Sequence, residues 1–121
     1  MAKTFLLLGA LAMALGVAAG AFSAHAAKGA AHPDAARLLQ SAVLYHLVHG
    51  LALVAVGIIA RGGTSPWLGA AGVLFVVGVL CFSGALWYLA MTGRSPGPIA
   101  PTGGLAFIAG WLALAIHALR A

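Results

Sequence analysis

The sequence predicts an all-α protein, an integral membrane bundle of four transmembrane helices that forms a single domain over residues 1–121. Residues 4–27, 38–60, 62–93 and 95–119 contain no Asp, Glu, Lys or Arg. Each stretch is long enough to cross a bilayer, which takes roughly 20 apolar residues. Hydrophobic residues make up 64% of the chain and charged residues only 6%, whereas about a quarter of the residues in a soluble domain are charged.

Proline, glycine and capping residues place the helices at about residues 4–24, 34–60, 66–92 and 102–119. Pro33 and Asp34 suit the first turn of the second helix, where the helix dipole favours an acid. Ser65 is a good N-cap for a helix that begins at Pro66, and Gly93 suits the position after the end of that helix. Three prolines within residues 94–101 predict a non-helical link before the last helix.

The N-terminal segment has two interpretations. Lys3, the apolar run that follows it and the Ala-His-Ala triplet at residues 24–26 resemble a secretory signal with a cleavage site. The apolar run reaches Phe22, however, and the apolar region of a signal peptide spans only about 7–15 residues. We therefore expect this segment to be retained as the first transmembrane helix.

The formal net charge of +5 comes from cations at the ends of the apolar stretches, which is typical of membrane-flanking anchors. Nucleic-acid binding would need clustered cations with exposed aromatic side chains, and the sequence has no such cluster. Four spans put three cations on each face of the membrane: Lys3, Arg61 and Arg120 on one, and Lys28, Arg37 and Arg94 on the other. The α-amine tips this balance towards a cytoplasmic location of both termini.

Small residues recur every four positions along the first helix and predict a ridge for helix packing, formed by Ala12, Gly16, Gly20 and Ala24. In lipid, small residues let two helix backbones approach closely, because packing drives helix association there. The ridge suits pairing within the chain or between chains. Gly103, Gly104 and Gly110 are the expected packing positions of the last helix.

Polar side chains gather towards the membrane face that carries the first and third links. The candidate polar pocket there consists of Ser23, His25, Tyr45, His49, Ser83, Tyr88 and Thr102. His49 lies deepest, so we expect its ring to face the bundle and to hydrogen-bond a group on the first or third helix. A neutral imidazole satisfied by a neighbour is the simpler reading, and a ligand-binding or proton-relay role is the alternative.

His46 and His49 share a helix face and suggest the start of a metal or haem site, with His25 or His117 as a further ligand. Against this reading, the sequence has no Cys–His cluster, and His117 belongs to the opposite membrane face. We therefore predict no bound metal and no cofactor.

Enzymatic activity is not indicated either. The one carboxylate, Asp34, lies at a helix start in the headgroup region. No nucleophile elbow and no phosphate-binding loop is present. The absence of a carboxylate within the apolar stretches also disfavours proton-coupled export.

Four motifs in order identify a resemblance to the YgdD-like family of small bacterial inner-membrane proteins. They are residues 20–25 (GAFSAH), 45–53 (YHLVHGLAL), 82–89 (FSGALWYL) and 98–104 (PIAPTGG), the last followed by Gly110-Trp111. The resemblance implies an uncleaved first helix, a four-helix membrane bundle in the inner membrane and no established activity.

Within these motifs, the family pattern matches this chain at His25, Tyr45 and His49. It also matches the proline and glycines that open the last helix, Pro101, Gly103 and Gly104. The chain departs from the pattern at four positions: Ser23 replaces a glycine, His46 a glutamine, Gly50 an alanine and Ala85 a serine. The change at His46 argues against a family metal site there.

These observations favour a non-enzymatic accessory or structural subunit of the membrane. Its expected partners are the lipid bilayer and a membrane protein or a second copy of the chain, contacted through glycine-lined helix faces. The alternative is a small transporter, or a lipid- or quinone-binding protein, with a pocket near His49.

Overall fold

The computed structural model describes residues 1–121 and contains helices but no strands. Its elements are α1 (Ala2–Lys28), α2 (Ala35–Ile59), α3 (Pro66–Gly78), the π-helical turn η1 (Val79–Ser83), α4 (Gly84–Thr92) and α5 (Ile99–Arg120). α3, η1 and α4 are continuous, so the chain has four helical spans, each long and apolar enough to cross a membrane. The predicted all-helical fold with four candidate spans is confirmed.

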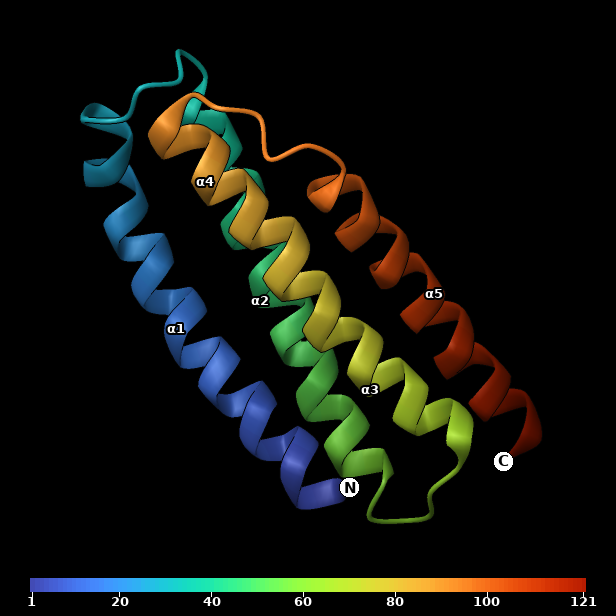
Figure 1. The fold of residues 1–121 in the computed structure, drawn as a ribbon. Coiled ribbons are helices and arrows are strands. Elements are labelled where there is room, and N and C mark those ends of the chain that lie inside the picture. The colour runs from blue at the N-terminus through green and yellow to red at the C-terminus, as the bar shows by residue number, and fades with distance from the viewer.

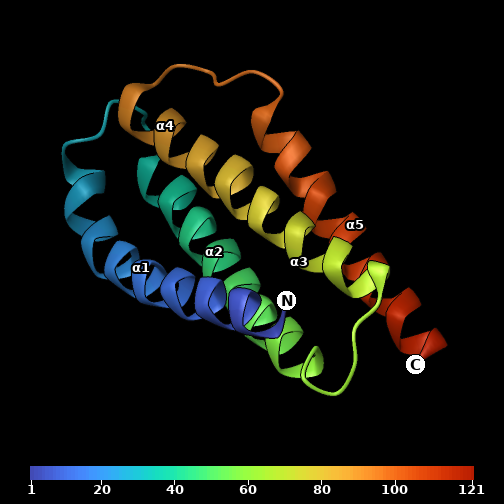
Figure 2. The same cartoon turned by 60° about the horizontal axis from the view of Figure 1, so that its bottom comes forward.

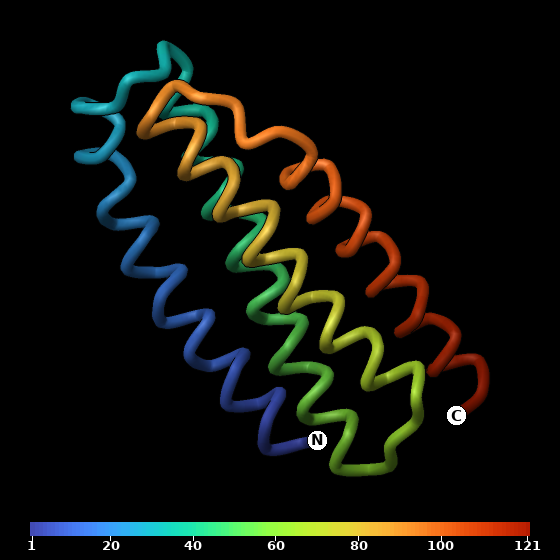
Figure 3. Tube along the Cα trace, viewed as in Figure 1, coloured from blue at the N-terminus to red at the C-terminus, as the bar shows by residue number.

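The four spans lie in a curved row and alternate in direction (Figures 1 and 2). α1 packs along α2, α2 packs along the continuous third span, and that span packs along α5. α1 and α5 lie at opposite ends of the row. Both termini lie at the end of the molecule that carries the α2–α3 link (Figure 3).

Glycines at seven-residue spacing form the contact between α1 and α2. Gly9 and Gly16 lie on α1, and Gly50 and Gly57 lie on α2. A Cβ atom added at Gly9 would lie 2.6 Å from the Val54 backbone nitrogen, and one at Gly57 would lie 2.6 Å from that of Leu6. A seven-residue repeat keeps the same stripe facing a neighbouring helix, so these glycines let the two backbones touch along their length.

The predicted four-residue ridge on α1 lies only partly in this contact. Gly16 and Gly20 face α2, beside Leu47 and Val43 respectively, whereas Ala24 is exposed. Each step of four residues turns a straight helix by about 40° beyond a full circle, so a four-residue ridge winds away from a straight neighbour. The central glycines of the ridge are therefore used within the chain.

Glycines also bring α5 close to the third span. A Cβ at Gly103 would meet the Phe82 backbone, and one at Gly110 would lie 2.7 Å from the Phe75 ring. Gly104 is farther away, with its added Cβ 3.8 Å from the Phe82 ring. Phe75 is fully buried in the main apolar cluster of the molecule.

The third span contains the π-helical turn η1 near its middle, where the sequence predicts an uninterrupted helix. π turns occur mostly as single turns inside α-helices, and often at functional sites. The turn rotates the residues after it relative to those before it, and it carries Phe82 and Ser83 at the contact with α2 and α5.

The ends of the third span follow the expected chemistry. The Ser65 side chain accepts a hydrogen bond from the Leu68 backbone N–H at 3.1 Å, which confirms the predicted N-cap. The same hydroxyl lies 2.7 Å from Nδ1 of His117 and joins this end to α5. Gly93 adopts a left-handed conformation with φ of 69° after the last turn, as predicted.

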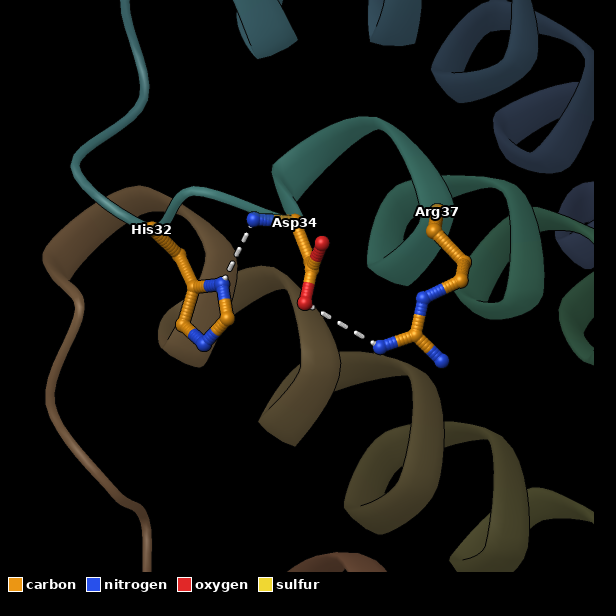
Figure 4. Close-up of polar contacts among 3 residues, drawn as sticks. All are labelled: His32, Asp34 and Arg37. Atoms are coloured by element: carbon orange, nitrogen blue, oxygen red, sulfur yellow. Dashed lines mark hydrogen bonds and ion pairs between the residues drawn. The ribbon is translucent and has the colours of Figure 1, made fainter.

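Three other helix ends differ from expectation. α1 continues to Lys28, and α5 begins at Ile99 because Pro101 falls in its first turn, where no backbone N–H donor is needed. α2 begins at Ala35, so Pro33 and Asp34 precede its first turn instead of lying in it, and the Asp34 side chain makes no capping bond. Instead it pairs with Arg37 at 3.3 Å, while the Asp34 backbone N–H donates to Nδ1 of His32 (Figure 4).

The Gly9→Ala variant tests the α1–α2 contact. We expect the unfolding free energy to fall by about 1–3 kcal/mol, the usual effect of overpacking, because the new methyl group would meet the Val54 backbone. Reversible unfolding in mixed micelles measures the change. Gly84→Ala is the control, because a Cβ there meets nothing within 4 Å. Equal stability of the two variants would contradict the close backbone contact.

Candidate functional site

Two imidazoles from the middle of α2 face different neighbours. His49 points towards α5, where its ring meets Phe107 and Trp111. His46 points towards α1, where its ring meets the Ala12 carbonyl and Gly16. α2 therefore carries two separate polar positions, each deep within the apolar part of the molecule.

His49 is 4% exposed, and both its ring nitrogens are hydrogen-bonded. Nδ1 lies 2.7 Å from the Tyr45 carbonyl oxygen, one turn earlier in α2. Nε2 accepts a hydrogen bond from the Trp111 indole N–H at 3.0 Å. A carbonyl only accepts and an indole only donates, so the geometry fits one neutral form of the ring, with its proton on Nδ1.

Aromatic rings enclose His49 on its remaining sides. Phe107 stacks on the imidazole with ring centroids 3.6 Å apart and planes 11° apart. Phe75 and Tyr45 lie at 5.5 Å and 6.2 Å, and Trp111 in turn packs on Phe75 at 4.9 Å. The ring is held by contacts from three spans, and no polar atom of it is left to bind a ligand.

The expected partner of His49 on the first or third helix is wrong, since its partner outside α2 lies on the last helix. The sequence carries a signal for the correct pair. α2 and α5 run in the same direction, His49 lies 14 residues after Ala35, and Trp111 lies 12 residues after Ile99. The two side chains therefore lie at similar depth, and an indole N–H in hydrocarbon needs an acceptor.

His46 has one satisfied and one free nitrogen. Its Nε2 donates to the Ala12 carbonyl oxygen at 2.7 Å, and a Cβ added at Gly16 would lie 3.1 Å from its Cδ2. This edge of the ring thus faces α1. Nδ1, on the opposite edge, makes no hydrogen bond. Every fully buried side-chain nitrogen or oxygen in the structure has a hydrogen-bond partner. Nδ1 is therefore not fully buried.

Ser83 lies at the contact between η1 and α2, in the same cavity as His46. It is buried, and its hydroxyl donates to the Ala42 carbonyl oxygen at 2.9 Å. This bond joins the π turn to α2. The two residues line the same groove, which is bounded by α1 and the third span.

The other residues of the candidate polar pocket are spread over the molecule. The Ser23 and Thr102 hydroxyls donate to carbonyls of their own helices, at Gly20 and Pro98. Ser23 lines a cleft between α1 and α2, and Tyr88 lines another between α4 and the link to α5. Tyr45, Tyr88 and His25 are exposed, the last in the final turn of α1. The seven positions therefore contribute to several separate surfaces.

The hypothesis that His46 and His49 begin a metal site is not supported by their placement. The two rings bond to opposite neighbours, Ala12 on α1 and Trp111 on α5. No three His, Cys, Asp or Glu side chains come together as a possible metal site. His117 bonds to Ser65, near the chain termini.

Residues 19–104 match the model of a family described as "Protein of unknown function (DUF423)". The UPF0382 membrane protein of Staphylococcus haemolyticus is 44% identical over 119 residues, which cover 98% of this chain and 97% of the relative. The UPF0382 membrane protein YwdK of Bacillus subtilis is 36% identical over 121 residues, with 98% of each chain covered. No solved structure matches. The implied resemblance to a membrane family of unknown function is confirmed.

Trp111→Phe tests the link between α2 and α5. The variant keeps an aromatic ring but removes the donor to Nε2 of His49, and hydrogen bonds between helices in membranes contribute about 0.6–1.7 kcal/mol. We expect unfolding in mixed micelles to become easier by this amount. In a double-mutant cycle with His49→Phe, the loss should be non-additive. Full additivity would show that the two rings are not coupled.

Proposed function

Because the chain belongs to the DUF423 family of membrane proteins of unknown function, we propose that it is a small non-enzymatic accessory subunit of the membrane. In this proposal it docks through a transmembrane helix face onto another membrane protein or a second copy of itself. We further propose that the YgdD-like and UPF0382 proteins form one family, which the four motifs in shared order support.

The exposure of α1 is the observation that carries the docking proposal. This helix lies at the end of the row and packs against α2 alone over most of its length. Only four of its 27 residues are buried: Phe5, Gly9, Gly16 and Ala26. The remainder of the helix is available to lipid or to a partner helix.

The outer face of α1 is rich in alanine. Ala10, Ala14, Ala18 and Ala21 are all exposed, on the side away from the glycines that contact α2. Lipid contact alone does not require small residues, whereas close helix packing does. The docking face we propose is therefore this alanine face. Gly16 and Gly20 of the predicted ridge instead pack against α2 within the chain.

The structure favours docking over a small-molecule pocket at His49. Both nitrogens of that ring are bonded and Phe107 stacks on its face. The cavities along α1 and the third span are lined by other residues. A transporter or lipid-binding site at His49 would require this cluster to open.

Ala14→Leu tests docking on the alanine face. We expect the variant to fold. The amount of partner complex, or of dimer, recovered on gentle extraction at native expression should fall about tenfold. Native mass spectrometry of the extract measures the recovered complex. Ala109→Leu, the same change at an exposed position of α5, is the matched control and should retain the complex.

Two outcomes would contradict the docking proposal. One is an unchanged complex in Ala14→Leu, and the other is a lone 12.0 kDa chain in the unmodified extract. Gly16→Leu distinguishes docking from folding, because its side chain would clash with Leu47 in α2. This variant should unfold more easily even where no partner is present.

We also propose that both termini lie on the cytoplasmic side of the bacterial inner membrane. Three cations flank each face, and the α-amine adds a positive charge to the face that carries the termini. In a Cys81→Ala background, a cysteine at Gly29 should react with a membrane-impermeant maleimide added outside. A cysteine at Gly63 should react only after the membrane is opened. The reverse labelling pattern would show that both termini lie on the outer side.

A further inference from the structure

A groove runs along α2 between α1 and the third span. It consists of two adjoining cavities of about 290 Å³ and 320 Å³ that share Leu15, His46, Val79 and Leu80. At one end, near the chain termini, α1 and α3 meet where Phe5 packs against Gly72. The groove is therefore bounded at that end by the protein itself.

The two halves of the groove differ in polarity. The half nearer the termini is lined by apolar side chains, among them Leu8, Leu11 and Val76. The other half adds Ser83 and the indole of Trp87. No Lys, Arg, Asp or Glu lines either half, so the groove suits an uncharged molecule with one apolar and one polar end.

His46 places a free hydrogen-bond acceptor where the two halves meet. Its Nε2 donates to a carbonyl, which only accepts, so in the neutral ring Nδ1 carries a lone pair. His46 is the twelfth residue of the 25 in α2 and lies near the middle of the bilayer, where no water is available. A polar atom left without a partner at this depth is unfavourable. A bound molecule that donates a hydrogen bond to Nδ1 would therefore be stabilised in the groove.

We propose that this groove binds one uncharged, lipid-soluble molecule that donates a hydroxyl hydrogen bond to Nδ1 of His46. Its hydrocarbon chain lies along Leu8, Leu11 and Val76, and its polar end lies towards Ser83 and Trp87. A hydroquinone with a hydrocarbon tail and a neutral glyceride both have this chemistry. The site is independent of the alanine face of α1, which lies on another side of that helix.

The π turn supports the assignment because three of its residues, Val79, Leu80 and Ser83, line the groove. Gly84, directly after the turn, leaves open space beside it. π turns are retained at functional sites despite their weaker geometry. The wall of the groove is thus the one irregular segment within the four spans.

Binding is measured on the full chain in lipid nanodiscs with three probes. These are a decyl naphthohydroquinone kept reduced under anaerobic conditions, its dimethyl ether, and didecanoylglycerol. Native mass spectrometry reports the number bound, and the ¹⁵N resonance of Nδ1 of His46 reports hydrogen bonding. We expect saturable binding of one hydroquinone or one glyceride per chain, with a shift of that resonance. Which of the two binds identifies the source of the ligand.

The methylated probe and His46 variants separate hydrogen bonding from apolar fit. Loss of one hydrogen bond should weaken binding about tenfold, so the dimethyl ether should bind the unmodified chain about tenfold more weakly than the hydroquinone. His46→Leu should lose the same factor. His46→Gln should retain binding, because its amide N–H can donate to the Ala12 carbonyl while its amide oxygen accepts from the ligand.

Gly84→Phe provides a variant that leaves His46 and its contact with α1 in place. Its ring would extend into the open space beside Gly84 and should block binding without loss of stability. The proposal is overturned if neither hydroxylated probe binds saturably, or if the hydroquinone binds and its dimethyl ether binds equally well. It is also overturned if a folded His46→Leu chain binds as tightly as the unmodified chain, or if a folded Gly84→Phe chain still binds.

Discussion

The direct contact of helix backbones at glycine is the interaction on which the rest of this structure depends. Between helices in lipid there is no hydrophobic driving force of the kind that folds soluble proteins, so close packing has to hold the helices together. Gly9 and Gly57 let α1 and α2 touch, and Gly103 and Gly110 let α5 settle on the third span. These contacts set the rotation of each helix and so determine which side chains face inward.

Once the helices are fixed, each polar group at membrane depth has to find a partner within the protein. His49 takes Tyr45 and Trp111, and Ser83 takes the Ala42 carbonyl. The bonds from Trp111 to His49 and from Ser83 to Ala42 each join α2 to another span. The few polar side chains therefore define how the spans are aligned, whereas apolar packing alone would permit several rotations. His46 departs from this pattern, since only one of its nitrogens is satisfied.

The sequence predicts the spans well because the charge and hydropathy of each stretch depend only on the residues within it. Ser65 and Gly93 were also predictable, since capping depends on residues adjacent in the chain. Helix rotation was harder to predict. Both four-residue and seven-residue spacings of small residues occur in α1, and only the neighbouring helix selects between them. The partner of His49 depends on how α2 and α5 curve around the third span, and the π turn has no clear signal in residues 79–83.

The row of helices has a consequence for assembly during synthesis. Nearly all extensive contacts join spans that are consecutive in the chain, and contacts of short sequence separation form quickly. The first hairpin, α1 with α2, can be complete before the third span leaves the ribosome, and each later span adds to a surface already in place. The bond from Trp111 to His49 joins positions 62 residues apart and can form only when the last helix arrives. This bond therefore forms in the last step of assembly.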